Sequence, residues 1–183
     1  MVFLGVPYPC PSHTPDTNIY IQKMCAEMRN KMKITEVLKS DKVTLSMEVF
    51  PPKTTTAAEK VNEAVRDIAA LKPHFMSVTY GAAGGGTSKY TIQIAKDIKD
   101  AYGVNSLAHL TCLSSTKETV EKQITLMREA GIENILALRG DIPKETEFPL
   151  PGQFHYAAEL VREIKRIAPE MCIGGACYPE GHP

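Results

Sequence analysis

Polar and ionisable side chains stand at or near the ends of several apolar, β-prone segments of the sequence. Glu48 lies near the end of the first segment, Thr79 near the end of the second, His109 in the third, Arg139 and Asp141 at the end of the fourth, and His182 after the fifth. A carboxyl group that is partly withdrawn from water tends to hold its proton, which suits a general acid. A single polar residue in such a place is more commonly a solvated loop residue or a local cap. Polar residues at or near the ends of five successive segments instead predict a shared, cup-shaped polar site that is suited to acid–base chemistry.

The segments that must position these residues alternate regularly between strand and helix patterns. Strands are predicted at 43–50, 75–80, 107–112, 134–138 and 172–178, and helices at 57–71, 89–102, 115–130 and 154–168. The repeat of roughly 30 residues is that of βα units, so a parallel sheet is expected. A TIM barrel and an open doubly wound sheet both fit, and both place their sites at the carboxyl ends of the strands. Neither a GxGxxG fingerprint nor a P-loop is present.

Three helix ends carry recognisable signals. Thr56 with Glu59, and Ser115 with Glu118, have the spacing of a capping box. Gly131 suits the end of the third helix, because glycine adopts the left-handed conformation that terminates many helices.

Composition excludes several classes of function. The 183 residues include 21 basic and 21 acidic side chains, so no excess of charge predicts binding to nucleic acid or to an anionic membrane. The five cysteines are odd in number and form no CxxC pair, so neither a disulfide framework nor a metal site is expected. Cys112, Cys172 and Cys177 are predicted to fill the core, and His74 and His155 to lie at the surface. No segment is long and apolar enough to cross a membrane, and a cytoplasmic protein is expected.

Residues 1–31 differ from the rest, because four prolines disfavour regular structure there. We expect an N-terminal extension, either disordered or upstream of the true start, followed by one domain over 32–183.

Five motifs give the domain a resemblance to a known family. They read SMEVFPPKT at 46–54, SVTYGA at 77–82, AHLTC at 108–112, NILALRGD at 134–141 and YPEGHP at 178–183. In this order they resemble the methylenetetrahydrofolate reductases, from about residue 32 to residue 183. The glycine-rich stretch at 81–87 and Val49 depart slightly from the family pattern.

The resemblance implies a (β/α)8 TIM barrel that binds FAD and uses NADH or NADPH to reduce 5,10-methylenetetrahydrofolate to 5-methyltetrahydrofolate. Glu48 resembles the family's general acid, and Asp141 the carboxylate beside flavin and folate; with Thr79 they would also contact the folate. The implied flavin contacts are Thr79, His109, Leu138, Arg139, Gly140, Asp141, Tyr156, Ala157, Ala176, Tyr178 and His182.

The family continues beyond the last motif, so about five βα units of an incomplete barrel are expected here. Open strand edges and a reduced core predict that the isolated chain folds poorly or binds FAD weakly. An inactive fragment, or a non-catalytic partner subunit of the same fold, is therefore the alternative function. An aldolase would need a Schiff-base lysine at a strand end, and none is visible. Homo-oligomerisation and the choice between NADH and NADPH stay open.

Overall fold

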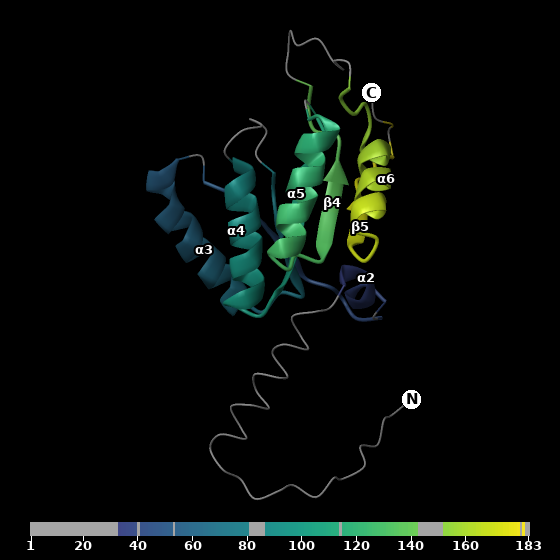
Figure 1. Ribbon diagram of the computed structural model, residues 1–183. Helices are drawn as coiled ribbons and strands as arrows, with labels where there is room; N and C mark the ends of the chain where they lie inside the picture. Colours follow the sequence, from purple (N-terminus) through teal and green to yellow (C-terminus); the bar gives the residue numbers. More distant parts are fainter. Residues whose placement is uncertain are drawn as a thin grey trace, which may run out of the picture.

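A computed structural model of the chain describes residues 33–39, 41–52, 54–80, 87–113, 115–142, 152–179 and 181. In these ranges five parallel strands form one sheet, in the order β1-β2-β3-β4-β5 (Figure 1). They are β1 (Ser46–Val49), β2 (Phe75–Val78), β3 (Asn105–Thr111), β4 (Asn134–Leu138) and β5 (Cys172–Gly175). Each strand pairs with the next one along the chain, without the reversal of order that defines a doubly wound sheet. The fold is therefore α/β, with the strand order of a TIM barrel.

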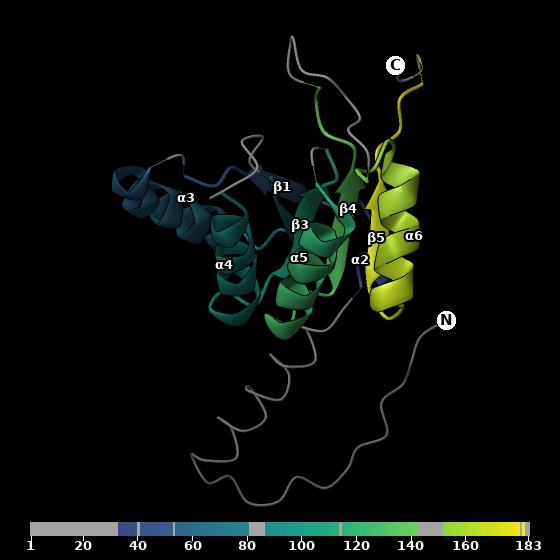
Figure 2. The ribbon, with the colours of Figure 1, turned by 45° about the horizontal axis from the view of Figure 1, so that its top comes forward.

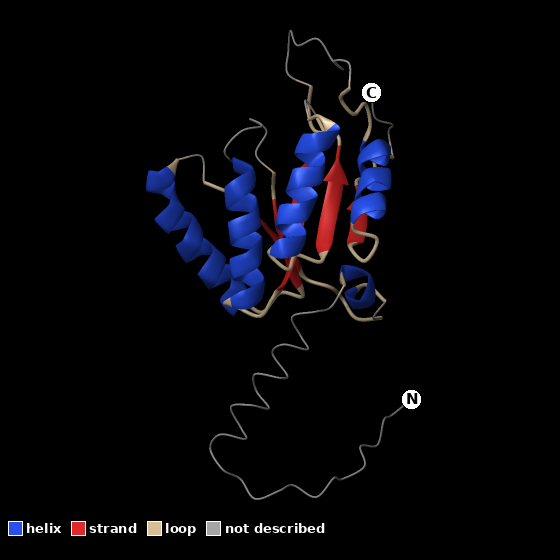
Figure 3. Cartoon of the chain, viewed as in Figure 1, coloured by secondary structure: helices blue, strands red, loops and turns tan. Residues whose placement is uncertain are grey.

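The longer helices lie together on one face of this sheet, as Figures 2 and 3 show. They are α3 (Ala58–Ala70, preceded by the 3-10 turn η1, Thr55–Ala57), α4 (Thr87–Asp100), α5 (Lys117–Glu129) and α6 (Ala157–Ile167). One-sided cover again separates a barrel segment from a doubly wound sheet, which carries helices on both faces. The prediction of alternating βα units is confirmed.

A short helix, α2 (Ile34–Val37), is placed at the amino-terminal ends of the strands. The backbone N–H of Ile34 donates to Oδ1 of Asn134, the first residue of β4, at 2.8 Å. The amide nitrogen of Asn134 in turn donates to the carbonyl of Ser106 in β3, at 3.0 Å. One buried side chain thus ties α2 to two strands.

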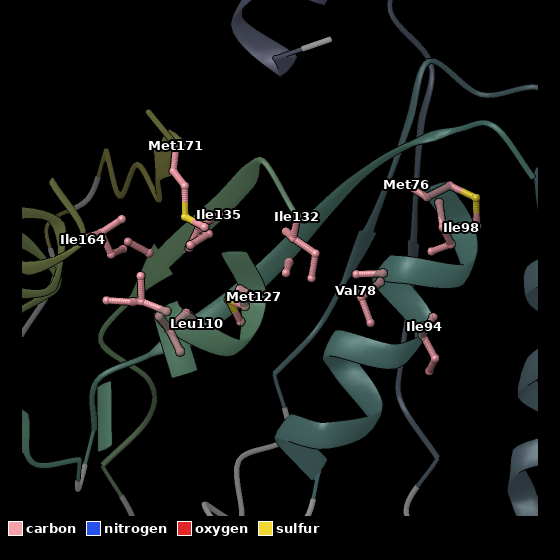
Figure 4. Packing of buried hydrophobic residues seen from close by; sticks show 14 of the residues in the cluster. Met76, Val78, Ile94, Ile98, Leu110, Met127, Ile132, Ile135, Ile164 and Met171 are labelled. Carbon is pink, nitrogen blue, oxygen red and sulfur yellow. The ribbon is translucent and has the colours of Figure 1, made fainter. Parts of the chain in front are cut away.

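The hydrophobic core fills the space between sheet and helices (Figure 4). Alternate residues of the strands contribute to it, among them Val49, Met76, Val78 and Leu110. The helices α4, α5 and α6 contribute Ile98, Met127 and Ile164 from the other side. Each such fully buried side chain contributes about 1.5–3 kcal/mol by leaving water. Because side chains alternate along a strand, Glu48, Ser77 and His109 project from the opposite, inner face.

Both predicted capping boxes are wrong in detail. The turn η1 precedes α3, so Ala57 occupies the N-cap position, and the hydroxyl of Thr56 instead contacts that of Thr54 at 3.0 Å. At α5 the cap is Thr116, whose Oγ1 accepts from the backbone N–H of Thr119 at 3.4 Å. The preceding hydroxyl, of Ser115, donates to the carbonyl of Leu113.

The predicted end of α5 is confirmed, because Gly131 has φ 73° and its N–H donates to the carbonyl of Arg128. Most strand ends are misplaced by a few residues, and β5 stops at Gly175, where its pairing with β4 stops.

Of the three cysteines assigned to the core, only Cys112 is buried; Cys172 is half-buried and Cys177 is exposed. Cys177 is exposed because β5 ends two residues before it. His74 and His155 are exposed, as predicted. The expectation for residues 1–31 falls outside the described residues. Within the described ranges, no helix combines the length and apolar character needed to span a bilayer.

Candidate functional site

Glu48 sits on the inner face of the sheet, one residue before the end of β1. It lies in register with Ser77 of β2, and the hydroxyl of Ser77 donates to Oε2 of Glu48 at 3.2 Å. Nε2 of His109, on β3, is 3.5 Å from the same oxygen. The Glu48 side chain is 48% exposed, whereas that of His109 is 9% exposed. The carboxylate is thus held on one side by two strands and open to solvent on the other.

The environment of His109 favours an uncharged imidazole. Burial lowers the pKa of the ring, and the nearby Glu48 carboxylate opposes that effect only in part. Among the described residues Nε2 has no hydrogen-bond partner, although it is fully withdrawn from solvent. A buried, unpaired ring nitrogen at the edge of an open sheet face is suited to receive a polar group of a ligand.

Thr79 directly follows β2 and extends the sheet by its backbone. Its N–H donates to the carbonyl of Val49 at 3.0 Å, and its carbonyl accepts from the hydroxyl of Thr91 on α4 at 2.9 Å. Thr91 is completely buried, so this helix-to-strand contact fixes the backbone at the carboxyl end of β2.

The stretch after β4 continues the β3–β4 pairing beyond the strands. The backbone N–H groups of Cys112 and Leu113 donate to the carbonyls of Leu138 and Arg139, at 3.1 and 2.9 Å. Gly140 then takes φ 92°, and an added Cβ would lie 3.2 Å from the Cβ of Leu113. Both its conformation and the nearby β3 segment require glycine here. Asp141 follows as an exposed carboxylate.

A pocket of about 330 Å³ lies where β4 and β5 end beside the start of α6. Six predicted residues line it: Leu138, Arg139, Tyr156, Ala157, Ala176 and Tyr178. Its wall also contains Ala137, Ala158, Val161 and Gly175, which the sequence analysis missed. Small apolar residues in strands and helices give no functional signal of their own, so sequence alone could not single them out.

The first turn of α6 opens toward this end of the fold. Tyr156 is the N-cap residue, but its side chain makes no capping hydrogen bond. The backbone N–H groups at a helix start carry a partial positive charge, which favours anionic groups of a ligand. Arg139 adds a guanidinium group to the same pocket.

The predicted residues therefore form two groups at the carboxyl edge of the sheet. Glu48 and His109 meet over β1–β3, together with Ser77, which was not predicted. The pocket residues meet over β4, β5 and α6, and Gly140 and Asp141 follow β4. His182 lies outside the described residues. No cluster of three potential metal ligands occurs among the residues that the structure describes.

Comparison with known proteins gives a consistent result. A family model described as methylenetetrahydrofolate reductase matches residues 33–183. The chain is 38% identical over 142 residues to the 5,10-methylenetetrahydrofolate reductase of Pectobacterium carotovorum, covering 78% of this chain and 46% of that protein. It is 40% identical over 146 residues to methylenetetrahydrofolate reductase 1 of Schizosaccharomyces pombe, covering 78% of this chain and 24% of the relative. The Arabidopsis thaliana methylenetetrahydrofolate reductase (NADH) 1 is 34% identical over 154 residues, covering 82% and 26%. The chain thus spans less than half the length of each of these relatives.

Proposed function

The chain belongs to the methylenetetrahydrofolate reductase family, and from this premise we propose that it contributes the reaction's acid and much of its cofactor site. The proposed reaction reduces 5,10-methylenetetrahydrofolate to 5-methyltetrahydrofolate with FAD and with NADH or NADPH. The observation that carries the proposal is the half-exposed Glu48 carboxylate, held by Ser77 beside the buried His109.

The residues at the carboxyl edge fit a flavin dinucleotide. The pocket offers the phenol rings of Tyr156 and Tyr178 for stacking, and Arg139 with the start of α6 for a pyrophosphate. Gly140 provides backbone without a side chain, which permits close approach. His109 and Thr79 would contact the ring system from β3 and β2. When bound, FAD would supply hydride transfer between nicotinamide and folate.

Glu48 would deliver the proton that the folate needs. Protonation of N10 would open the five-membered ring and leave a cationic iminium, which accepts hydride readily. The open side of Glu48 lets solvent return the proton after each turnover. Asp141, with its exposed carboxylate, would stabilise the cation by charge.

The test is anaerobic stopped-flow absorbance on the purified chain loaded with FAD. NADH or NADPH should bleach the flavin, and methylenetetrahydrofolate should restore its colour. In Glu48→Gln the restoring half-reaction should slow by roughly 10²–10⁴-fold, the usual contribution of a general acid, while bleaching is unchanged.

Lys165→Gln serves as a control, because Lys165 is exposed in the last turn of α6, at the end of the helix away from the carboxyl edge. Equal loss of both half-reactions in Glu48→Gln would contradict the assigned role. A colourless chain that co-purifies with another protein would support the alternative of a non-catalytic partner subunit.

A further inference from the structure

We propose that Ser77 is a positioning residue: its hydroxyl group holds Oε2 of Glu48 and thereby leaves Oε1 as the oxygen that exchanges the proton. The part of this inference that concerns the substrate rests on the proposed function. The part that concerns the Glu48 carboxyl group rests on the geometry of β1 and β2 alone.

Ser77 has the rigidity that such a role needs. It is 8% exposed, lies in β2 between β1 and β3, and is in register with Glu48 on one side and Leu107 on the other. A serine side chain is short and has only the few staggered χ1 rotamers, so its hydroxyl on a fully paired strand can occupy few positions. Glu48 has a longer side chain that is 48% exposed, and it would otherwise sample several rotamers.

The two oxygens of Glu48 have different surroundings. Oε2 accepts from the Ser77 hydroxyl at 3.2 Å and faces Nε2 of His109 at 3.5 Å. Among the described residues, no hydrogen bond or ion pair involves Oε1. Nε2 of His109 makes no hydrogen bond among the described residues, so the Ser77 hydroxyl is the donor that orients the carboxylate.

A hydroxyl donor at Oε2 serves both protonation states of the acid. With Oε1 protonated, Oε2 is a carbonyl oxygen and still accepts from Ser77. When the proton passes from Oε1 to the substrate nitrogen, the O–H bond breaks, an N–H bond forms, and Ser77 then donates to a carboxylate. The same contact therefore holds the carboxyl group in one orientation before and after the proton leaves.

Carboxyl-carbon NMR of the chain labelled at glutamate tests this directly, with the Glu48 signal assigned by its loss in Glu48→Gln. In Ser77→Ala, the chemical shift of this signal at neutral pH should change and the side chain should become more mobile, because the donor that holds Oε2 is lost. Ser77→Thr keeps the hydroxyl and should restore both the chemical shift and the mobility. Ser106→Ala is the matched control, because Ser106 is equally buried in β3 and belongs to the opposite, helix-facing side.

An unchanged chemical shift and mobility of Glu48 in Ser77→Ala would overturn the proposal. If that variant does not fold, Ser77→Cys keeps the size while weakening the donor, and a change in the same direction is expected. In a flavin-loaded chain, Ser77→Ala should slow the folate half-reaction roughly tenfold to a hundredfold and leave nicotinamide oxidation unchanged. If even the unaltered chain fails to reduce the folate, the proposed function fails, while the NMR comparison still decides whether Ser77 holds Glu48.

Discussion

The imidazole of His109 faces the carboxylate of Glu48 across β2, with 3.5 Å between Nε2 and Oε2. The ring is buried and the carboxylate is half-exposed, so they are not an ordinary surface ion pair. Burial withdraws His109 from the water that would solvate its charge, and the attraction to Glu48 compensates only in part. The contact therefore joins a carboxylate to a largely neutral ring.

The first prediction concerns the titration of this ring. Its pKa should lie below the ordinary 6.5, and in Glu48→Gln it should fall further, because the neighbouring negative charge raises it. Two-dimensional NMR of the imidazole signals over a pH series measures both values. A higher histidine pKa in Glu48→Gln than in the unaltered chain would contradict the arrangement.

The same shift has a consequence for stability. Because the folded-state pKa is the lower one, the unfolded state binds more protons between the two values. The free energy of unfolding should therefore fall as the pH drops below about 6.5, and stop falling below the folded-state pKa. His109→Gln should remove this contribution, whereas replacing the exposed His155 should leave it. Urea titrations between pH about 7.5 and about 5.5 provide the comparison.

Sequence reasoning predicted the order of strands and helices because apolar periodicity reflects burial on one face. It placed the ends less well, since caps depend on where the first turn closes. The 3-10 turn before α3 moved the cap from Thr56 to Ala57, a change that no spacing of residues signals.

The candidate site was predictable only where a residue carries its own chemical signal. Glu48, His109 and Arg139 stand out by type, so their positions at strand ends could be noticed. Ser77 lies between Met76 and Val78 in an apolar strand, and its role depends on its register with β1. The two strands are separated in sequence by a helix, so the pattern within β2 does not indicate which residue of β1 lies beside Ser77.

Gly140 provides a second prediction. Alanine there would hold φ 92° against the preference of an L-residue and would place Cβ 3.2 Å from the Cβ of Leu113. We expect a loss of about 1–3 kcal/mol in the free energy of unfolding and weaker flavin binding. Gly175→Ala is the matched control for stability alone, since nothing lies within 4 Å of its added Cβ but Gly175 lines the proposed flavin pocket. Urea denaturation and flavin fluorescence titration measure the two effects; equal stability of the two variants would contradict the assignment.

Thr91 provides a third prediction. Thr91→Val keeps the shape but leaves the carbonyl of Thr79 without the hydroxyl that donates to it at 2.9 Å. A buried acceptor left unpaired costs about 1–3 kcal/mol, so unfolding should occur at lower urea concentration. Thr91→Ser should retain most of the stability that valine loses. Thr125→Val is the comparison, because the Thr125 hydroxyl donates to the Glu121 carbonyl one turn back in the same helix, α5. Thr91→Val as stable as Thr91→Ser would show that the hydroxyl is dispensable.

The last prediction concerns the contact between α5 and α6. Arg166 on α6 donates to Oε1 of Glu163 at 2.7 Å and also contacts the Glu121 carboxylate on α5. Hydrogen bonding by Arg166 lowers the pKa of Glu163 from its ordinary 4.5, so the folded state holds the ionised form more strongly than the unfolded chain does.

The resulting stabilisation is present above pH about 4.5 and is lost as the pH falls through the folded-state value. Arg166→Met should therefore unfold more easily than the unaltered chain at neutral pH, and the difference should shrink in acid. It should also shrink in concentrated salt, because Arg166 is 61% exposed and its charge is screened. Arg162→Met changes an exposed arginine of the same helix outside this cluster and should show neither dependence. A pH-independent difference for Arg166→Met would mean that its aliphatic stem, and not its charge, joins the two helices.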